Sequence, residues 1–246
     1  GVDAGDPVLS LKTANNAMIA ANTPQTVEGT ASDSGGLISL VRYAIDSGDL
    51  TGAAETWWFV DTAKNGDKAN TITIEGSAFT DTITAAGIGD TDGRRRYIAT
   101  DVYGNTSTLD FIYSVDSFVP VIKVDPSVTF ANDEWRASKT QKVQVLVNDT
   151  GADGNKRSSG ITNVKYVIDP VSANQETIKE GTDLAIGASR DSDGTTSGNR
   201  VYNIYSTTFD FADDGIHSIY AGTWDSVGNY RQIGPITYKI DTTPPK

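Results

Sequence analysis

The sequence Val-Arg-Tyr-Ala-Ile-Asp occupies residues 41–46, and a near copy, Val-Lys-Tyr-Val-Ile-Asp, occupies residues 164–169. In both segments apolar side chains fall on every second residue, which is the pattern of a β-strand with one buried face. Each segment follows another predicted strand that ends in an aspartate, Asp33 in the first case and Asp149 in the second. The chain therefore contains the same structural unit twice.

A second matched pair of segments lies farther along each unit. Asp-Val-Tyr-Gly-Asn occupies residues 101–105, and Asp-Ser-Val-Gly-Asn occupies residues 225–229. Glycine adopts positive φ angles easily and aspartate accepts hydrogen bonds from nearby amides, so we expect each segment to form the turn of a β-hairpin. The alternative is that Asp101 and Asp225 bind a metal ion. Each turn precedes a predicted strand that ends in aspartate, at Asp116 and at Asp241.

These repeats divide the chain into two domains, residues 1–117 and 118–246. Each holds about seven predicted strands, the number found in an immunoglobulin-like sandwich of ~100 residues. The predicted fold class is therefore all-β, with two tandem immunoglobulin-like β-sandwiches joined by a short linker. The strands are predicted near residues 7–12, 25–33, 37–46, 56–60, 70–84, 95–101 and 107–116, and then near residues 120–130, 141–149, 161–169, 176–180, 201–211, 216–225 and 230–240.

The composition of the 246 residues excludes several classes of function. The 32 acidic and 20 basic side chains give a formal net charge of −12, which argues against binding to nucleic acid or to an anionic membrane surface. The absence of cysteine excludes disulfides, cysteine-ligated metal centres and thiol catalysis. No apolar run approaches the ~20 residues of a membrane helix. His217 is the single histidine, which excludes a metal site with several histidines.

Catalysis has little support in the sequence, and we expect no enzyme activity. A Ser-His-Asp triad needs a histidine, and His217 stands alone in a strand-like segment. Neither a phosphate-binding loop nor a dinucleotide-binding fingerprint occurs. The one basic run, Arg94-Arg95-Arg96, is interpreted as a solvated strand face, the alternative being a local contact patch for a partner.

The order of these motifs resembles the tandem bacterial Ig-like domains of secreted and cell-surface proteins. Repeats of that family carry a V-x-Y-x-I-D strand, a D-x-x-G-N turn and an end similar to V-D-T-T-P-P, which reads Ile-Asp-Thr-Thr-Pro-Pro at residues 240–245. The first unit departs from this pattern with Asp-Ser-Phe-Val-Pro at residues 116–120. The resemblance implies a non-catalytic module at an extracellular or cell-surface location, acting as a stalk, in adhesion or in protein interaction, with a linker to a further domain at its end.

The adjacent pair Trp57 and Trp58 is the most unusual apolar cluster. Neighbouring residues of a strand point to opposite faces, so one ring is expected to pack inward and the other to point outward or under a loop. The alternative to core packing is an aromatic platform that binds a sugar ring. That alternative fits an accessory carbohydrate-binding or spacer module of a secreted polysaccharide-degrading enzyme, whereas a surface module would have a host or bacterial surface protein or glycan as its partner.

Calcium is the one cofactor that the sequence suggests. The ion takes about 6–8 oxygen ligands, and aspartate-rich turns supply carboxylates and carbonyls. Calcium at the junctions of some bacterial Ig-like arrays implies Asp33 and Asp116 as ligands by resemblance, beside the turn residues Asp101 and Asp225. The alternative is that all four are solvated turn aspartates.

Overall fold

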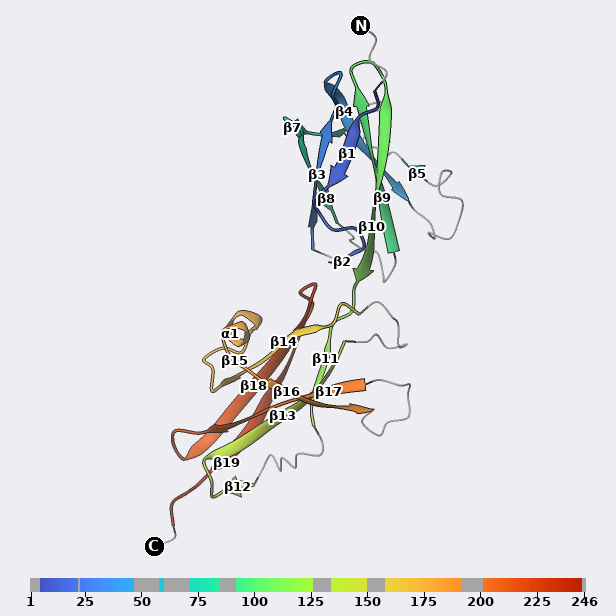
Figure 1. Ribbon diagram of the computed structural model, residues 1–246. Helices are drawn as coiled ribbons and strands as arrows, with labels where there is room; N and C mark the ends of the chain where they lie inside the picture. Colours follow the sequence, from blue (N-terminus) through green and yellow to red (C-terminus); the bar gives the residue numbers. More distant parts are fainter. Residues whose placement is uncertain are drawn as a thin grey trace. The chain divides into compact units, whose positions relative to one another are not determined.

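The computed structural model describes residues 5–21, 23–46, 58–59, 71–84, 92–125, 134–149, 158–191 and 201–244. The chain divides into two compact units, Gly1–Ser117 and Phe118–Lys246, which we term the first and the second domain (Figure 1). Each domain consists of β-strands, with one short helix among the described residues of the second.

The first domain contains two sheets. One has the strand order β1 (Val8–Leu11), β3 (Gln25–Ser32), β8 (Ala78–Ile83) and β7 (Ile74–Glu75). The other has the order β2 (Ala17–Ala20), β10 (Thr106–Asp116), β9 (Asp92–Asp101), β4 (Ile38–Asp46) and β5 (Trp58–Phe59), and β6 (Thr71–Ile72) also pairs with β4.

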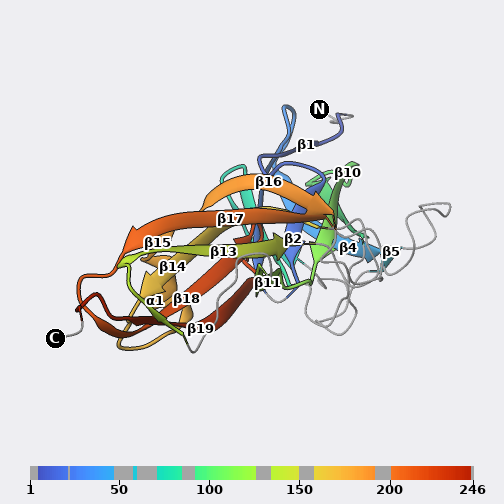
Figure 2. The same ribbon diagram turned by 90° about the horizontal axis from the view of Figure 1, so that it is seen from below.

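The second domain repeats this arrangement. One sheet has the order β11 (Val121–Val124), β13 (Thr140–Asn148), β17 (Val201–Asp210) and β16 (Ala185–Asp191). The other has the order β12 (Trp135–Arg136), β19 (Tyr230–Ile240), β18 (Gly215–Asp225), β14 (Ile161–Ile168) and β15 (Thr182–Asp183). Figure 2 shows β13, β16 and β17 of this domain as one layer and β14, β18 and β19 as the other.

The main strands of the two domains correspond to one another. The antiparallel set β10-β9-β4 corresponds to β19-β18-β14, and β1-β3-β8 corresponds to β11-β13-β17. In each domain an early, short strand also runs parallel to the last strand, β2 beside β10 and β12 beside β19. This division of strands between two sheets is that of the immunoglobulin-like sandwich, so the all-β prediction and the predicted sandwich fold are confirmed.

Alternating side chains from both sheets fill each core, as the period of two in the sequence requires. Because these side chains come from both sheets of a domain, each domain has its own hydrophobic core. The buried members include, in the first domain, Val27, Val41, Phe79, Tyr97 and Phe111, and in the second domain, Val145, Val164, Ile219, Tyr238 and Ile240.

The prediction of a strand at residues 176–180 is wrong, because this segment forms the helix α1 (Gln175–Lys179). Asn174 caps the helix, since its Oδ1 accepts a hydrogen bond of 2.9 Å from the amide of Thr177. Ile178 is fully buried and holds the helix to the domain. A helix this short does not display a period of 3.6 residues, and its periodicity could not identify it.

Further, smaller differences concern the strands. The predicted strand at residues 70–84 is divided into β6, β7 and β8, with Gly76 at a φ of 64° between the last two. The sequence did not predict the strands β2, β12, β15 and β16. Among the described residues, no helix has the length and apolar character needed to cross a bilayer.

Candidate functional site

The turns that contain the repeated Asp-x-x-Gly-Asn motif have the same geometry in both domains. Asp101 Oδ1 accepts hydrogen bonds of 2.8 Å from the amides of Tyr103 and Asn105, and its Oδ2 accepts one of 2.8 Å from Asn105 Nδ2. The glycine between them has a φ of 92°. The turn therefore closes the β9–β10 hairpin, as predicted, with the carboxylate as its internal acceptor.

Asp225 plays the same part between β18 and β19. Its Oδ1 accepts hydrogen bonds from the amides of Val227 at 3.0 Å and Asn229 at 2.8 Å, and its Oδ2 accepts one of 2.8 Å from Asn229 Nδ2. The glycine of this turn also has a φ of 92°. We call each of these aspartate–asparagine turns a turn lock.

The hydrogen bonds of the lock favour the charged form of the aspartate. Desolvation by burial opposes ionisation of Asp101, but the bonds from Asn105 and Tyr103 outweigh it and hold the pKa of the carboxyl below its ordinary value. The lock of the first domain therefore favours an ionised aspartate, which links this turn to pH.

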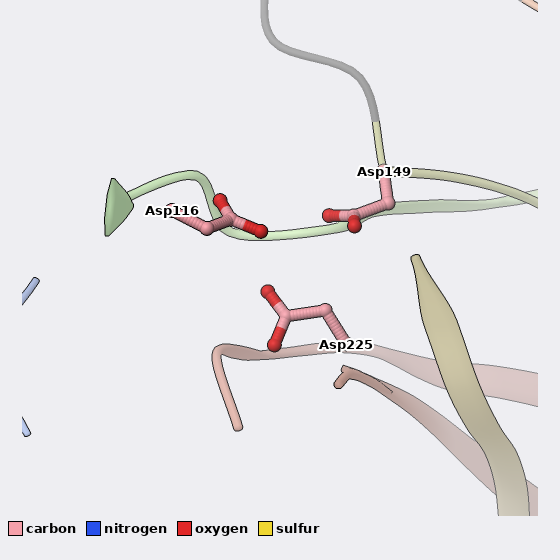
Figure 3. A group of neighbouring side chains, drawn as sticks. All are labelled: Asp116, Asp149 and Asp225. Carbon is pink, nitrogen blue, oxygen red and sulfur yellow. The ribbon is translucent and has the colours of Figure 1, made fainter. Parts of the chain in front are cut away.

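A second buried carboxylate lies beside the lock of the second domain. Asp149 follows β13, and its Oδ2 accepts hydrogen bonds from Ser158 Oγ at 2.8 Å and from the Gly160 amide at 2.7 Å. Carboxylate oxygens of Asp149 and Asp225 lie within 4.8 Å of each other, and both residues are more than nine-tenths buried. Figure 3 shows the carboxylates of Asp149 and Asp225. The predicted ligand Asp116 is the last residue of β10 and belongs to the first domain.

The four predicted calcium ligands thus have different surroundings. Asp225 has a carboxylate neighbour within its own domain, Asp149, which is not one of these four. The sequence feature that marks Asp149 is its position at the end of a predicted strand, which is the position of Asp33 in the first unit. Asp33 accepts a long hydrogen bond of 3.4 Å from the Gly35 amide, and its buried Oδ2 has no partner among the described residues. Neither Asp33 nor Asp101 belongs to a group of three acidic or histidine side chains in the described part of the chain.

The predicted glycan platform cannot be placed on the described surface. Trp57 lies outside the described residues, and Trp58 starts β5, where its backbone pairs with Asp46 of β4. The second domain offers two other tryptophans. Trp135 of β12 is 59% exposed, and Trp224 of β18 is almost wholly covered.

The single histidine lies beside an aspartate, but the arrangement is not a catalytic triad. His217 Nδ1 lies 2.6 Å from Asp169 Oδ2, and its Nε2 lies 3.2 Å from the carbonyl oxygen of Asp213. The hydroxyl of Ser218 lies 3.4 Å from Asp169 and not beside the imidazole. A triad needs the serine hydroxyl on the histidine ring, so this serine has no base to activate it.

The basic run is not a solvated strand face throughout. Arg95 is buried, and its Nη1 lies 2.5 Å from Asp81 Oδ2. Its guanidinium also lies over the ring of Tyr43, at 4.2 Å from the centroid. Arg96 pairs with Asp110, with Nε 2.7 Å from Oδ1. The interpretation was wrong for Arg95 because side chains alternate between faces, and this one shares the inward face with Tyr97.

The comparisons with known proteins give neither a family nor a close relative. No family model matches the chain, and no curated protein sequence matches it. Three solved structures illustrate the likeness of fold. The fibronectin(III)-like modules of Clostridium thermocellum CbhA are 14% identical, with a TM-score of 0.43 over 95% of this chain and 93% of that chain.

The two others are more distant. The C-terminal domain of the Streptococcus pyogenes antigen I/II-family protein AspA is 12% identical, with a TM-score of 0.37 over 95% of this chain and 99% of that chain. The N-terminal Ig1-2 module of the Drosophila receptor protein tyrosine phosphatase DLAR is 9% identical, with a TM-score of 0.32 over 96% and 100%. All three scores are below 0.5, so the fold assignment rests on the strand order of this chain.

Proposed function

We propose that this chain is a non-catalytic, extracellular module of a bacterial surface protein and acts as a load-bearing stalk that presents an adhesive surface. The observation that carries the proposal is the parallel pairing of an early strand with the last strand in each domain. A pull on the two ends of such a domain draws the paired strands past each other, so their hydrogen bonds are loaded together. Bonds that must break together resist force better than bonds that open one at a time.

The join between the domains supports the same role. β10 ends at Asp116 and β11 begins at Val121, so four residues connect the last strand of one sandwich to the first strand of the next. One of them is Pro120, which has a fixed φ and stiffens the segment relative to a glycine–serine linker. Short, stiff joins suit a spacer.

Variants of the parallel pair in the first domain test the stalk role. β2 and β10 are registered from Ala17 beside Tyr113 to Ala20 beside Asp116, and Met18 lies opposite Ser114. Met18→Pro removes an amide and fixes a backbone angle in this pair. In single-molecule pulling of the whole chain, we expect the unfolding force of the first domain to fall.

The matched control is Lys12→Pro. The amide of Lys12 donates a hydrogen bond of 2.8 Å to the carbonyl of Glu28, outside the parallel pair. In this variant the melting temperature of the first domain should fall, but its unfolding force in the pulling experiment should stay the same. Equal loss of force in both variants, or no loss in Met18→Pro, would overturn the stalk proposal.

We also propose that calcium binds at the carboxylates of Asp149 and Asp225. Two buried negative charges within 4.8 Å repel each other, and a divalent cation with oxygen ligands relieves that repulsion.

Calorimetry tests the calcium proposal. An ion that binds only the folded state stabilises it by about 2.7 kcal/mol at a hundred times its dissociation constant, so millimolar calcium should raise the melting temperature of the second domain relative to EDTA. Asp149→Asn should abolish the increase. Glu180→Gln removes an exposed charge of the same domain and should keep it. An unchanged melting temperature in calcium would contradict the proposal.

A further inference from the structure

A groove of about 440 Å³ opens on the outer face of the second domain. Its floor comes from Asn163 and Lys165 of β14 and from Trp224 of β18, and Lys179 of α1 lies at its side. Asn163 and Lys165 alternate with Val164, which faces the core. The volume lies in the range of small-ligand sites, which is ~300–1,000 Å³.

The helix α1 fixes one wall of this groove. Ile178 is fully buried, and a Cβ atom at Gly222 of β18 would lie only 3.0 Å from Ile178 Cγ2. The glycine therefore lets the helix approach the sheet closely. Lys179 directly follows this anchored residue, so the helix holds the start of its side chain beside the groove.

The aromatic part of the floor is rigid. Trp224 is registered between Asn163 of β14 and Tyr230 of β19. Its ring lies 4.7 Å from that of Tyr230, at an interplanar angle of 36°. Burial raises the pKa of Tyr230 to about 12, so the phenol stays neutral, and it donates a hydrogen bond of 2.8 Å to Gln232 Oε1. The exposed part of the indole is thus held in one position.

The lining of the groove contains two lysines, Lys165 and Lys179, and one aspartate, Asp225, in a protein with a net charge of −12. Lys165 Nζ lies 3.4 Å from the carbonyl of Gly181 and 3.7 Å from Asp183, whose side chain is 73% exposed. Lys179 is exposed. The carboxylate of Asp225 accepts three hydrogen bonds from its own turn and is directed to them. Two ammonium groups therefore line the groove, beside one carboxylate that its own turn engages.

We propose that this groove binds a carboxylated sugar unit, such as a uronic acid residue of an acidic glycan. The two ammonium groups match a carboxylate, and the Asn163 amide both donates and accepts as a sugar hydroxyl does. The small accessible part of the indole, 8% of the residue, supplies apolar surface beside the sugar ring. A bare phosphate would leave the indole unused. The proposal names the partner class of the adhesive surface and rests on the proposed function for that role alone.

The first domain offers the internal comparison. Thr100 stands where Trp224 stands, one residue before the aspartate of the turn lock, and Arg42 stands where Lys165 stands. Without the tryptophan and without a counterpart of α1 among its described residues, the first domain lacks this combination of groups. We therefore expect sugar binding in the second domain only.

The test is a titration of the whole chain with trigalacturonate. Binding is monitored by calorimetry and by the amide signals of each domain in NMR spectra. Its fully methyl-esterified form is the matched neutral ligand, and triglutamate is the matched acidic peptide. We expect trigalacturonate to shift amides near residues 163–165, 179 and 224–228, and the ester to bind about tenfold or more weakly. Rising salt should weaken binding.

Variants assign the site. Lys165→Gln and Lys179→Gln should each weaken binding about tenfold, whereas Lys142→Gln, which removes an exposed lysine from β13 of the same domain, should leave it unchanged. The proposal would be overturned if millimolar trigalacturonate did not bind, or if the methyl ester bound as tightly as the acid. It would also be overturned if Lys142→Gln weakened binding as much as the two groove variants do. Tighter binding of triglutamate would assign the groove to acidic peptides instead. None of these outcomes alters the pulling result, so the stalk proposal is judged separately.

Discussion

The two domains share a sheet topology and a turn lock but fill one core position in opposite ways. Counted back from the lock aspartate, Arg95 of β9 and Ile219 of β18 occupy the same place, and so do Tyr97 and Ala221. All four are buried. The first domain therefore buries an ionic group where the second buries only apolar ones. The fold depends on the alternation of inward and outward residues and tolerates both chemistries at one inward site.

The ionic core is held by a small network. Asp81 Oδ2 accepts hydrogen bonds from Arg95 Nη1 at 2.5 Å and from the Tyr97 hydroxyl at 3.0 Å, and its Oδ1 accepts one from the Thr82 amide. Burial, reinforced by the charge of Asp81, raises the pKa of Tyr97, so this phenol remains a donor. Each member has a partner, which a buried charge requires.

The largest expected effect comes from breaking this network in the first domain. Asp81→Ala leaves the Arg95 guanidinium buried without its counter-ion, and such losses cost about 3–5 kcal/mol. Denaturant unfolding, followed through NMR signals of each domain, should show the first domain destabilised and the second unchanged. Adding Arg95→Ile to Asp81→Ala copies the second domain at this position and should restore much of the lost stability.

A second ion pair of the same strand serves as the control. Arg96 and Asp110 are partly exposed, with side chains 20% and 29% accessible, so Asp110→Ala should cost only about 0–1 kcal/mol. If Asp81→Ala and Asp110→Ala destabilised the first domain equally, the buried ion pair would contribute no more than an exposed one. The contrast between an ionic and an apolar core would then be wrong.

The next effect concerns the feature that the domains share. Asp101→Ala and Asp225→Ala each remove an acceptor of three hydrogen bonds, and we expect each to destabilise its own domain by about 2–3 kcal/mol in EDTA. In calcium, Asp225→Ala should cost more than it does in EDTA, because it also removes a proposed ligand. If the two variants lost different amounts of unfolding free energy in EDTA, the two turn locks would not be equivalent.

The smallest effect is a pH dependence in the second domain. Burial opposes the ionisation of Asp169, but hydrogen bonds from His217 and the Ser218 amide lower the pKa of its carboxyl. The ionised Asp169 therefore stabilises the domain above the pKa of the unfolded chain, which is about 3.9. This stabilisation is lost as the pH falls through the lower pKa of the folded state.

Asp169→Asn tests this expectation with little change of the backbone. Residue 169 has a φ of 46°, which asparagine tolerates. The variant should cost the second domain about 1 kcal/mol at pH 6 and less at pH 3, measured by denaturant unfolding. A cost that did not change with pH would assign the effect to packing and not to the charge of the carboxylate.

Most of the architecture could be read from the sequence, because strand period and turn chemistry are local properties. The matched segments at residues 41–46 and 164–169 predicted equivalent strands, β4 and β14. What failed depended on contacts between distant segments. The helix α1 is stabilised by Ile178 against Gly222, and the burial of Arg95 depends on Asp81, a partner in another strand.

The candidate sites were less predictable for the same reason. Asp225 was chosen from its motif, whereas its proximity to Asp149 depends on how β13 and β18 are placed in the sandwich. The groove joins residues of β14, β18 and α1, and no short segment contains its pattern. The position of Asp149 in the repeat, which corresponds to that of Asp33, is visible in the sequence.

The stalk role is tested most directly by pulling the wild-type chain from its two ends and recording the force of each unfolding event. The described residues of the first domain register four residue pairs between β2 and β10, and those of the second register two between β12 and β19. Two discrete events are expected, with the second domain unfolding at the lower force. Extension without discrete events, or the first domain unfolding at the lower force, would contradict the account.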